Sequence, residues 1–331
     1  DETGQCIEQP FEETVHPDGR FKEKVKLTAY PVEDRFGMLW AYMGPLPAPI
    51  LPIWEPYSYD NGVANVAIVE LPCNWLQCME NSLDPVHLEW LHGYWGEVQM
   101  REAKRKNGDA PELVPIIPKH HKKIGFSEFD NGIIKRRVAG ENATEDDADW
   151  QVGHPAIFPN ILYVGDMVKC NFQYRVPIDD THTWNVELTS YWFPDDVDVP
   201  QQERVPYQYV PLKRPDGRWR SDDTVAQDHI AWILQGPIMD RTAERLGESD
   251  TGLIFYRRML EEQMDIVADG GEPKNVFRAP ALNMLVHVPQ EGWSRLGHNA
   301  DIDEIARYGS HLRDAIADII QHSKNTSGLT A

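Results

Sequence analysis

The 331-residue sequence has little positive charge, no long apolar run and few cysteines, and each shortage excludes a class of protein. Lys and Arg number 32 against 53 Asp and Glu, which gives a formal net charge of −21. Such an excess of negative charge repels phosphate backbones and anionic lipid, so we expect neither a nucleic-acid partner nor a membrane partner. No apolar run approaches the roughly 18–20 residues that a membrane-spanning helix needs.

The cysteines form no CxxC pair and suggest no disulfide framework. This usage favours the reducing cytoplasm as the location of the protein. Hydrophobic residues make up 41% of the chain, enough for a sizeable core, so composition excludes disorder, collagen and coiled coil. The length fits one large domain or two ordinary ones. The four cysteines are Cys6, Cys73, Cys78 and Cys170.

A proline-rich stretch divides the sequence. Residues 45–52 contain four prolines, a density that no helix or central strand tolerates, so we predict an extended linker and a domain boundary there. A proline-rich surface loop within one domain is the alternative. Residues 1–44 are predicted to form strands and tight turns, with β-strands over 25–30 and 37–44.

The part after the linker is predicted to be α+β, with antiparallel strands and long helices packed against them. A turn signal at residues 130–132 indicates a hairpin over 126–138. Apolar residues spaced by three and four predict a helix over 253–267, ended by Gly270 and Gly271. The remaining predictions are strands over 63–71, 161–176 and 183–192, and helices over 74–92 and 302–319.

One predicted helix carries most of the chemistry. Asn81, Asp84 and His87 are spaced by threes, which places them on adjoining parts of one helix face. His92 follows His87 by five residues, which is about 140° away on an ideal helix. A kink at Asp84-Pro85 would bring the two imidazoles to one point. Two imidazoles and a carboxylate form the facial triad that suits non-haem iron(II).

Simpler structural roles fit the same residues. Asp84 followed by Pro85 is also the pattern of a helix N-cap with proline at the first helical position. His87 and His92 are equally consistent with partly buried histidines that bind no metal. Because HxxxxH spacing is not a strong metal signature, the spacing alone leaves both interpretations open.

Residues 80–92 read ENSLDPVHLEWLH and closely resemble the ENxxDxxHxxxxH segment of Rieske non-haem iron oxygenases, in the catalytic domain of the α (oxygenase) subunit. Residues 240–260, which begin DRTAERLGESDTG, resemble the second signature of the phthalate-dioxygenase-like branch. Residues 1–44 resemble the last strands of the Rieske domain, after its second cluster-binding loop. The resemblance thus covers nearly the whole chain.

The resemblance implies a domain organisation and a fold. Residues 1–44 would be a remnant of the all-β Rieske [2Fe-2S] domain, and residues 45–52 the linker. Residues 53–324 would be the catalytic mononuclear iron domain, followed by a tail over 325–331. The catalytic domain is expected to be a helix-grip (START-like) α+β arrangement, in which a curved antiparallel sheet wraps a long helix with the pocket between them.

The resemblance also implies the metal ligands. His87 and His92 match the two iron-ligating histidines, and Asp250 matches the carboxylate ligand. Asp240 and Glu244 are the fallback carboxylates. Asp250 also fits a helix cap, because it lies at the start of the predicted helix, where an aspartate meets free N–H groups.

Two further residues have counterparts in the family. Asp84 matches the aspartate that bridges an iron-ligating histidine of one subunit and a cluster histidine of its neighbour. Such a carboxylate fixes the imidazole tautomer and couples the two centres for electron transfer. Asn81 matches a polar residue that lies close to the iron in some members.

One departure from the family is large. A Rieske cluster needs two thiolates and two imidazoles, from CxH and CxxH pairs, and this sequence contains neither spacing. We therefore expect no cluster-binding residues in the chain. The simplest interpretation is a sequence truncated at its N-terminus, since the family's cluster loops lie upstream of the segment that resembles residues 1–44. A genuinely cluster-free protein is the alternative.

The function implied by the resemblance is that of an oxidoreductase in aromatic catabolism. The oxygenase component would activate O2 at a mononuclear Fe(II) and hydroxylate or O-demethylate an aromatic compound. Electrons from NAD(P)H would arrive through a reductase or ferredoxin and the Rieske cluster, and members of this branch are commonly homotrimers. Residues 71–77 look closer to the lignin-aryl O-demethylases. A non-catalytic helix-grip protein that binds a hydrophobic ligand is the alternative.

Overall fold

The computed structural model describes residues 1–58, 61–107, 120–165, 170–192, 199, 202–221, 223–283 and 285–289. The chain forms two compact units. One consists of Asp1–Pro52 with Phe277–Met284, and the other of Ile53–Val276 with Leu285–Ala331. The predicted helix over 302–319 and the predicted tail over 325–331 lie outside the described residues.

The smaller unit contains a short helix and a hairpin. Helix α1 spans Pro10–Val15, and a 3₁₀ helix spans Arg20–Lys24. Strands β1 (Val32–Arg35) and β2 (Met38–Ala41) pair antiparallel. Phe36 and Gly37 join them with φ values of 58° and 73°, the left-handed conformation that matches the twist of a two-residue hairpin turn.

The strand predicted over 25–30 is wrong. Within that stretch Lys26 makes a single bridge to Gln5, and no strand forms. The alternation of β-branched and aromatic residues is present, but Leu27 is 75% exposed and has no sheet face to cover. Alternation predicts a strand only where a neighbouring strand supplies backbone partners.

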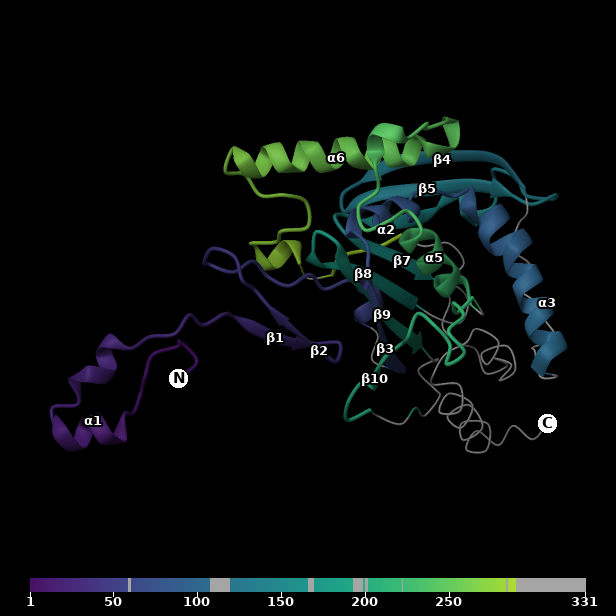
Figure 1. The fold of residues 1–331 in the computed structure, drawn as a ribbon. Helices are drawn as coiled ribbons and strands as arrows, with labels where there is room; N and C mark the ends of the chain where they lie inside the picture. Colours follow the sequence, from purple (N-terminus) through teal and green to yellow (C-terminus); the bar gives the residue numbers. More distant parts are fainter. Residues whose placement is uncertain are drawn as a thin grey trace, which may run out of the picture. The chain divides into compact units, whose positions relative to one another are not determined.

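The larger unit is built on one eight-stranded sheet (Figure 1). Every neighbouring pair is antiparallel except β10 and β3. The predicted α+β class with antiparallel strands is therefore confirmed. In spatial order the strands are β10 (Tyr207–Tyr209), β3 (Gly62–Leu71), β9 (His182–Trp192), β8 (Cys170–Asp179), β7 (Ile161–Gly165), β6 (His154–Ile157), β5 (Gly132–Ala139) and β4 (His121–Phe129).

Two predictions of element length need correction. The strand expected over 161–176 is in fact two strands, β7 and β8, which pair antiparallel from Ile161–Tyr174 to Gly165–Cys170. The helix expected over 74–92 is interrupted. Helix α2 spans Trp75–Asn81, and the chain resumes as a π-helix over Leu88–Trp95 that continues into α3 (Gly96–Asn107).

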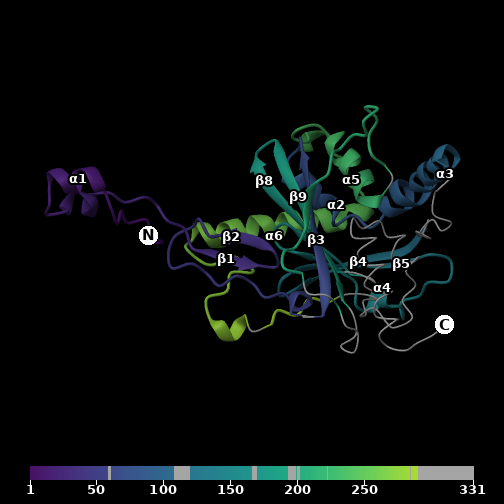
Figure 2. The same ribbon diagram turned by 90° about the horizontal axis from the view of Figure 1, so that it is seen from below.

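The other helices are α4 (Ala148–Gln151), α5 (Thr224–Ile233) and α6 (Thr251–Ala268), with 3₁₀ turns at Glu55–Tyr57, Arg241–Ala243, Glu248–Asp250 and Pro280–Leu282. Helix α2 contacts β8 and α5, and both views show α2 and α5 next to β8 and β9 (Figures 1 and 2). Within the described residues, no helix is both long and apolar enough to cross a membrane.

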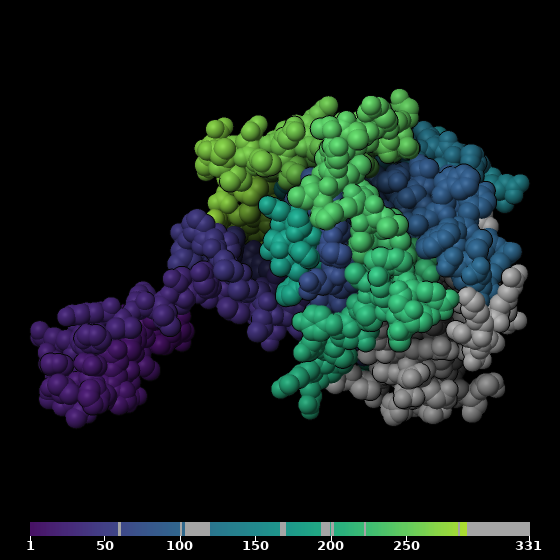
Figure 3. Space-filling model, in the orientation of Figure 1, coloured from purple at the N-terminus to yellow at the C-terminus, as the bar shows by residue number. Residues whose placement is uncertain are grey.

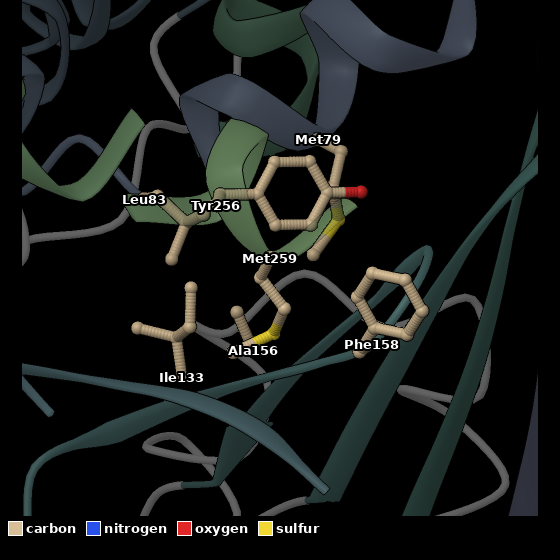
Figure 4. Close-up of a cluster of buried hydrophobic side chains, with 7 residues drawn as sticks. All are labelled: Met79, Leu83, Ile133, Ala156, Phe158, Tyr256 and Met259. Atoms are coloured by element: carbon tan, nitrogen blue, oxygen red, sulfur yellow. The ribbon is translucent and has the colours of Figure 1, made fainter. Parts of the chain in front are cut away.

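A buried apolar cluster joins α2 and α6 to the sheet (Figure 4). Met79 and Leu83 come from α2 and the turn after it, and Tyr256 and Met259 come from α6. They meet side chains of β5 and β6 and of the residue that follows β6. Each of these side chains is almost wholly removed from water, so the cluster fixes the ends of α2 and α6 relative to the sheet. Its members are Met79, Leu83, Ile133, Ala156, Phe158, Tyr256 and Met259.

An ion-pair network connects the same helices. The Glu80 carboxylate is 5% exposed and accepts hydrogen bonds from Arg257 at 2.7 Å and Arg241 at 3.0 Å. Arg257 also pairs with Glu244 at 2.7 Å. Because each charge in the network faces an opposite charge, the Glu80 carboxylate is tolerated at this depth.

Met259 and Met264 provide a matched test of the cluster. Both lie on α6, one side of which is open surface (Figure 3). Met259 is 2% exposed, whereas Met264 is 62% exposed. We expect Met259→Ala to lower the free energy of unfolding by about 2–5 kcal/mol through the cavity it leaves. Met264→Ala should change it by less than about 0.5 kcal/mol. Urea unfolding followed by circular dichroism measures both; equal effects would contradict the assignment of the core.

Candidate metal centre

The break after α2 sets the position of the first histidine. Short i→i+3 backbone bonds close the turn, ending with Asp84 N–H to Asn81 O at 3.0 Å. Asp84 Oδ1 then accepts the backbone N–H groups of Val86 (2.8 Å) and His87 (3.3 Å). Asp84 thus caps the next helical segment, with Pro85 in the position where a missing N–H costs nothing.

A π-helix brings the second histidine beside the first. The N–H of Gly96 bonds to Leu91 O, five residues earlier, as in the wider π turn. This widening returns residues five apart to nearly the same face, whereas an α-helix would separate them by about 140°. The rings of His87 and His92 lie 5.1 Å apart at 77° to one another. The π-helix therefore accomplishes what a kink at Pro85 was expected to do.

Helix α5 supplies a carboxylate to the same point. Asp228 Oδ1 lies 3.1 Å from His92 Nε2 and 3.6 Å from His87 Nε2. The ligand atoms of the three residues all fall within 4.8 Å of one another. Asp223 caps α5 by accepting the N–H of Ala226 at 2.7 Å. This cap fixes where the helix begins and therefore the position of Asp228 along the helix axis.

The other nitrogen of each imidazole is held by an oxygen. His87 Nδ1 donates to the carbonyl of Asp84, and His92 Nδ1 donates to Gln227 Oε1 at 2.9 Å. In the neutral imidazoles these acceptors favour the proton on Nδ1, so that both Nε2 atoms can offer a lone pair to a metal ion. Gln227, which is 1% exposed, is itself oriented by donating to Ser221 O at 3.1 Å.

Gly96 leaves room for this arrangement. A Cβ at position 96 would lie 3.0 Å from Gln227 Oε1, the atom that orients His92. Gln227 is buried and hydrogen-bonded, so it has little freedom to withdraw. A side chain at position 96 would therefore disturb the orientation of His92 through Gln227.

Burial and mutual charge determine the pKa values here. Burial lowers the pKa of His87 to about 4, although the charges of Asp228 and Asp84 oppose it. Burial acts in the same direction on His92, but the charge and hydrogen bond of the nearer Asp228 raise its pKa above the ordinary value. Burial raises the pKa of Asp228, and the charge and hydrogen bond of His92 more than offset this, so the carboxylate is ionised.

The donor set fits a divalent transition metal. Asp228 Oδ1 is buried and faces the Nε2 atoms of His92 and His87. When both imidazoles are neutral and carry their proton on Nδ1, neither Nε2 atom donates to this oxygen, which is costly for a buried carboxylate. A cation in contact with this oxygen and the two Nε2 atoms would remove that cost. Two neutral imidazoles and one carboxylate on one side of a metal are the facial triad of non-haem iron(II).

A cavity of about 330 Å³ adjoins the triad. Strands β3 and β5 to β9 form one wall, and α5 with the His87–His92 segment forms the other. The strand register aligns polar side chains across the first wall: Asn65 pairs with Thr189, and Thr189 with Asn171. Apolar lining comes from Leu162, Val164 and Tyr191, among others. The cavity therefore has the size and mixed character of a pocket for a small organic molecule.

The carboxylate predicted as the third ligand is not the one that the structure brings to the histidines. Asp250 lies at the start of α6, where Oδ2 accepts the N–H of Gly247 at 2.7 Å. It does not line the cavity. Asp228 occupies the position that was expected for Asp250, because the fold packs α5 against the π-helix.

The fallback carboxylates are also engaged elsewhere. Asp240 is an N-cap that accepts hydrogen bonds from the hydroxyl of Thr242 at 2.6 Å and from its N–H at 3.0 Å, and these two bonds lower the pKa of Asp240. Glu244 pairs with Arg257. Both contacts are structural.

The two remaining predicted residues do lie near the triad. Asn81 lines the cavity together with His87 and His92. Asp84 contacts His87 twice, through its carbonyl and through a carboxylate oxygen 3.8 Å from Nδ1. Its side chain remains 28% exposed, so it reaches both the histidine and the surface.

Sequence reasoning missed Asp228, and a signal for it was present. Residues 224–233 read TVAQDHIAWI, an otherwise largely apolar helix with an aspartate in its interior. Acidic residues are seldom buried unless paired or bound to a metal. Asp228 is 136 positions beyond His92, however, and no local spacing connects the two.

The sequence is similar to those of known oxygenase subunits. The chain is 44% identical over 314 residues to the 5,5'-dehydrodivanillate O-demethylase oxygenase subunit of Sphingobium sp. (strain NBRC 103272 / SYK-6), covering 95% of this chain and 70% of that protein. It is 30% identical over 275 residues to the phthalate 4,5-dioxygenase oxygenase subunit of Pseudomonas putida, covering 72% and 59%. No family model matches the chain.

The chain therefore belongs to the Rieske non-haem iron oxygenases, as a relative of their oxygenase subunits. The predicted family and oxidoreductase class are confirmed, and the catalytic role is supported over the non-catalytic ligand-binding alternative. Members of this family use a mononuclear Fe(II) and a Rieske [2Fe-2S] cluster, with electrons supplied by a reductase. The 331 residues contain neither CxH nor CxxH, the spacings that ligate a Rieske cluster.

Solved structures agree in fold. NdmA of Pseudomonas putida CBB5, as a QL mutant with caffeine, matches with a TM-score of 0.53 at 14% identity, covering 84% of this chain and 71% of NdmA. NdmB of the same organism matches with a TM-score of 0.52 at 14% identity, covering 82% and 69%. At these identities the likeness concerns the fold alone.

Two aspartate variants separate the candidate carboxylates. We expect Asp228→Ala to abolish tight Fe(II) binding, because it removes the one anionic donor. Asp250→Ala should retain the metal and lower the free energy of unfolding by about 1 kcal/mol, the typical contribution of a capping carboxylate. Iron analysis after desalting, together with urea unfolding, distinguishes them. Loss of iron in Asp250→Ala with retention in Asp228→Ala would reverse the assignment.

Proposed function

We propose that His87, His92 and Asp228 hold a mononuclear iron(II), and that the chain performs O-demethylation of an aromatic methyl ether. The observation that carries the proposal is the convergence of two imidazole Nε2 atoms and one buried carboxylate oxygen beside a cavity. The choice of O-demethylation rests on sequence, since identity to the O-demethylase subunit is 44%, against 30% for the dioxygenase subunit.

Iron bound at this triad supplies the activation of O2. The residues of the chain supply position and shielding. Asp84 and Gln227 hold the imidazoles in the Nδ1–H tautomer, so that the Nε2 lone pairs stay directed at one point. The burial of His92 keeps bulk water from its ring. The adjoining cavity of about 330 Å³ accommodates a substituted aromatic ring next to the triad.

The overall reaction balances with two external electrons. An aryl methyl ether, O2, two electrons and two protons yield a phenol, formaldehyde and water. We propose that the electrons originate from NAD(P)H and pass through a reductase or ferredoxin and a Rieske cluster, as in the family. Since this sequence has no CxH or CxxH pair, that cluster is not held by these residues.

Ring dioxygenation is the second candidate. The oxygenase subunit of phthalate 4,5-dioxygenase is 30% identical to this chain, and the same triad and cavity serve either outcome. The two reactions differ in which part of the substrate faces the metal.

We propose further roles from the family resemblance. Asp84 would carry electron transfer from a neighbouring subunit, supported by its contact with His87 and its partial exposure. Asn81 would lie near the iron and contact substrate or oxygen. Residues 1–44 would belong to the Rieske domain, residues 45–52 to the linker and residues 53–324 to the catalytic domain. The protein would be a homotrimer in the cytoplasm, where its four free cysteines would stay reduced.

Iron content tests the metal site. The purified chain loaded with Fe(II) without oxygen should retain about one iron per chain, as expected for one facial triad. His87→Ala should retain less than about a tenth of that, since two donors hold the metal far more weakly than three. The matched control is His16→Ala, an exposed histidine. Equal iron in wild type and His87→Ala would contradict the site.

Product analysis tests the reaction. Hydrogen peroxide carries both the oxygen and the two electrons, so the iron-loaded chain can be assayed without a cluster. With 4-methoxybenzoate and peroxide we expect 4-hydroxybenzoate and formaldehyde in equal amounts, absent in Asp228→Ala and present in His16→Ala. A cis-diol would favour ring dioxygenation. No product from a chain that holds its iron would contradict both candidates.

A further inference from the structure

Buried polar atoms without partners gather in the metal-site cavity. Besides Asp228 Oδ1, the cavity lining includes Asn65 Oδ1 and Ser82 Oγ, which have no hydrogen bond of normal geometry in the described part of the chain. It also includes the buried ring of His154, whose nitrogens have no such bond apart from a contact with the backbone of Tyr163. Buried polar groups are nearly always hydrogen-bonded, by water or ligand if not by protein. The cavity is therefore built for a molecule with polar groups of its own.

Ser82 and His154 both lie next to a buried lysine, Lys135. Lys135 on β5 is 3% exposed, lines the same cavity and donates from Nζ to the carbonyl of Ser82 at 2.9 Å. It is also directly opposite His154 on β6 in the strand register. Directly opposite residues of an antiparallel pair have Cβ atoms about 4.5–5.5 Å apart. Lys135 thus lies between Ser82 and His154.

The three side chains share a chemical character. The ammonium of Lys135 and the hydroxyl of Ser82 donate hydrogen bonds, and a histidine ring carries at least one N–H. Arg137, two residues along β5, lines the cavity as well, although it pairs with Asp149 at 3.0 Å. This group of donors lies close to the triad, because it lines the same cavity as His87 and His92. Donors around a cation are suited to an anion.

The acidic residues of the lining lie on other elements and have partners. Glu187 on β9 accepts from Asn185 Nδ2 at 3.0 Å. Asp223 accepts the N–H of Ala226 and faces Arg220 at 3.4 Å. Asp228 faces the two histidines. None of these carboxylates belongs to β5 or β6, the strands that carry Lys135 and His154.

We propose that Lys135, Ser82 and His154 form a carboxylate-binding subsite inside the metal-site cavity, so that the substrate is an aromatic carboxylate. The identity of the bound molecule as substrate rests on the proposed function; the preference for a carboxylate does not. Lys135 supplies the charge, Ser82 and His154 supply hydrogen bonds, and the apolar side chains Leu162 and Val164 receive the ring.

Benzoate and benzamide are the probes. They have nearly the same shape, and only benzoate is charged. Isothermal titration of the Fe(II)-loaded chain without oxygen should show benzoate binding at least about tenfold more tightly than benzamide, since a hydrogen bond to a charged group contributes more than one between neutral groups. Benzoate binding no tighter than benzamide binding would overturn the proposal.

Variants assign the preference to the subsite. Lys135→Met should weaken benzoate by about tenfold to a hundredfold and change benzamide by less than about threefold, while Lys135→Arg keeps most of the preference. The control is Lys123→Met, on β4, where the lysine is 47% exposed and pairs with Glu145. His154→Leu leaves the contact between Lys135 and Ser82 intact and should also reduce the preference. Unchanged preference in both Lys135→Met and His154→Leu would overturn the subsite, and if Lys135→Met does not fold, His154→Leu decides.

Iron-free protein separates this proposal from the proposed function. In His87→Ala, which should hold less than about a tenth of the wild-type iron, benzoate should still bind more tightly than benzamide, because Lys135 and not the metal makes the distinction. Loss of the preference there would assign it to the metal and overturn the subsite. Failure of the wild-type chain to bind iron, with the benzoate preference intact, would contradict the proposed function alone.

Discussion

The larger unit is organised around one constraint: two imidazole nitrogens and one carboxylate oxygen must meet in a buried place with their lone pairs directed at one point. Each imidazole has only one lone pair to offer, so its other nitrogen needs an acceptor of its own. The Asp84 carbonyl and Gln227 provide these acceptors. An unbroken α-helix would neither bring the two Nε2 atoms together nor place an acceptor at each Nδ1. The turn after α2 and the π-helix change the direction and the pitch of the chain so that both are met.

The rest of the unit holds that arrangement in position. The apolar cluster and the ion pairs of Glu80 anchor α2. Glu80, the first residue of the ENxxDxxHxxxxH segment, therefore holds the helix in place, whereas the histidines of the segment face the cavity. The sheet closes the far side of the cavity, and its register decides which side chains face the triad. Lys135 illustrates the coupling, because it contacts the turn that positions His87 and lines the pocket beside it.

The sequence predicted the parts of the site that lie close together along the chain. His87, His92, Asp84 and Asn81 share one segment, and its spacing with the family resemblance identified them. The hairpin of β4 and β5 and helix α6 followed from turn residues and apolar periodicity. The strand expected over 25–30 failed because alternation does not reveal whether a partner strand exists. Asp250 was predicted as the third ligand, but the structure places Asp228 beside the histidines. A carboxylate at a helix start satisfies a local rule whether or not a metal is near.

By itself the sequence determined the class of chemistry. The acidic composition, the two histidines, the α+β pattern and the lack of cluster-ligand spacings can all be found in the order of the residues alone. Only the tertiary structure decided which carboxylate joins the histidines and which polar side chains share their cavity. The physical reason is distance along the chain. Asp228 is separated from His92 by 136 positions, and Lys135 from Ser82 by 53. Packing of α5 and β5 against the broken helix, not local spacing, brings them together.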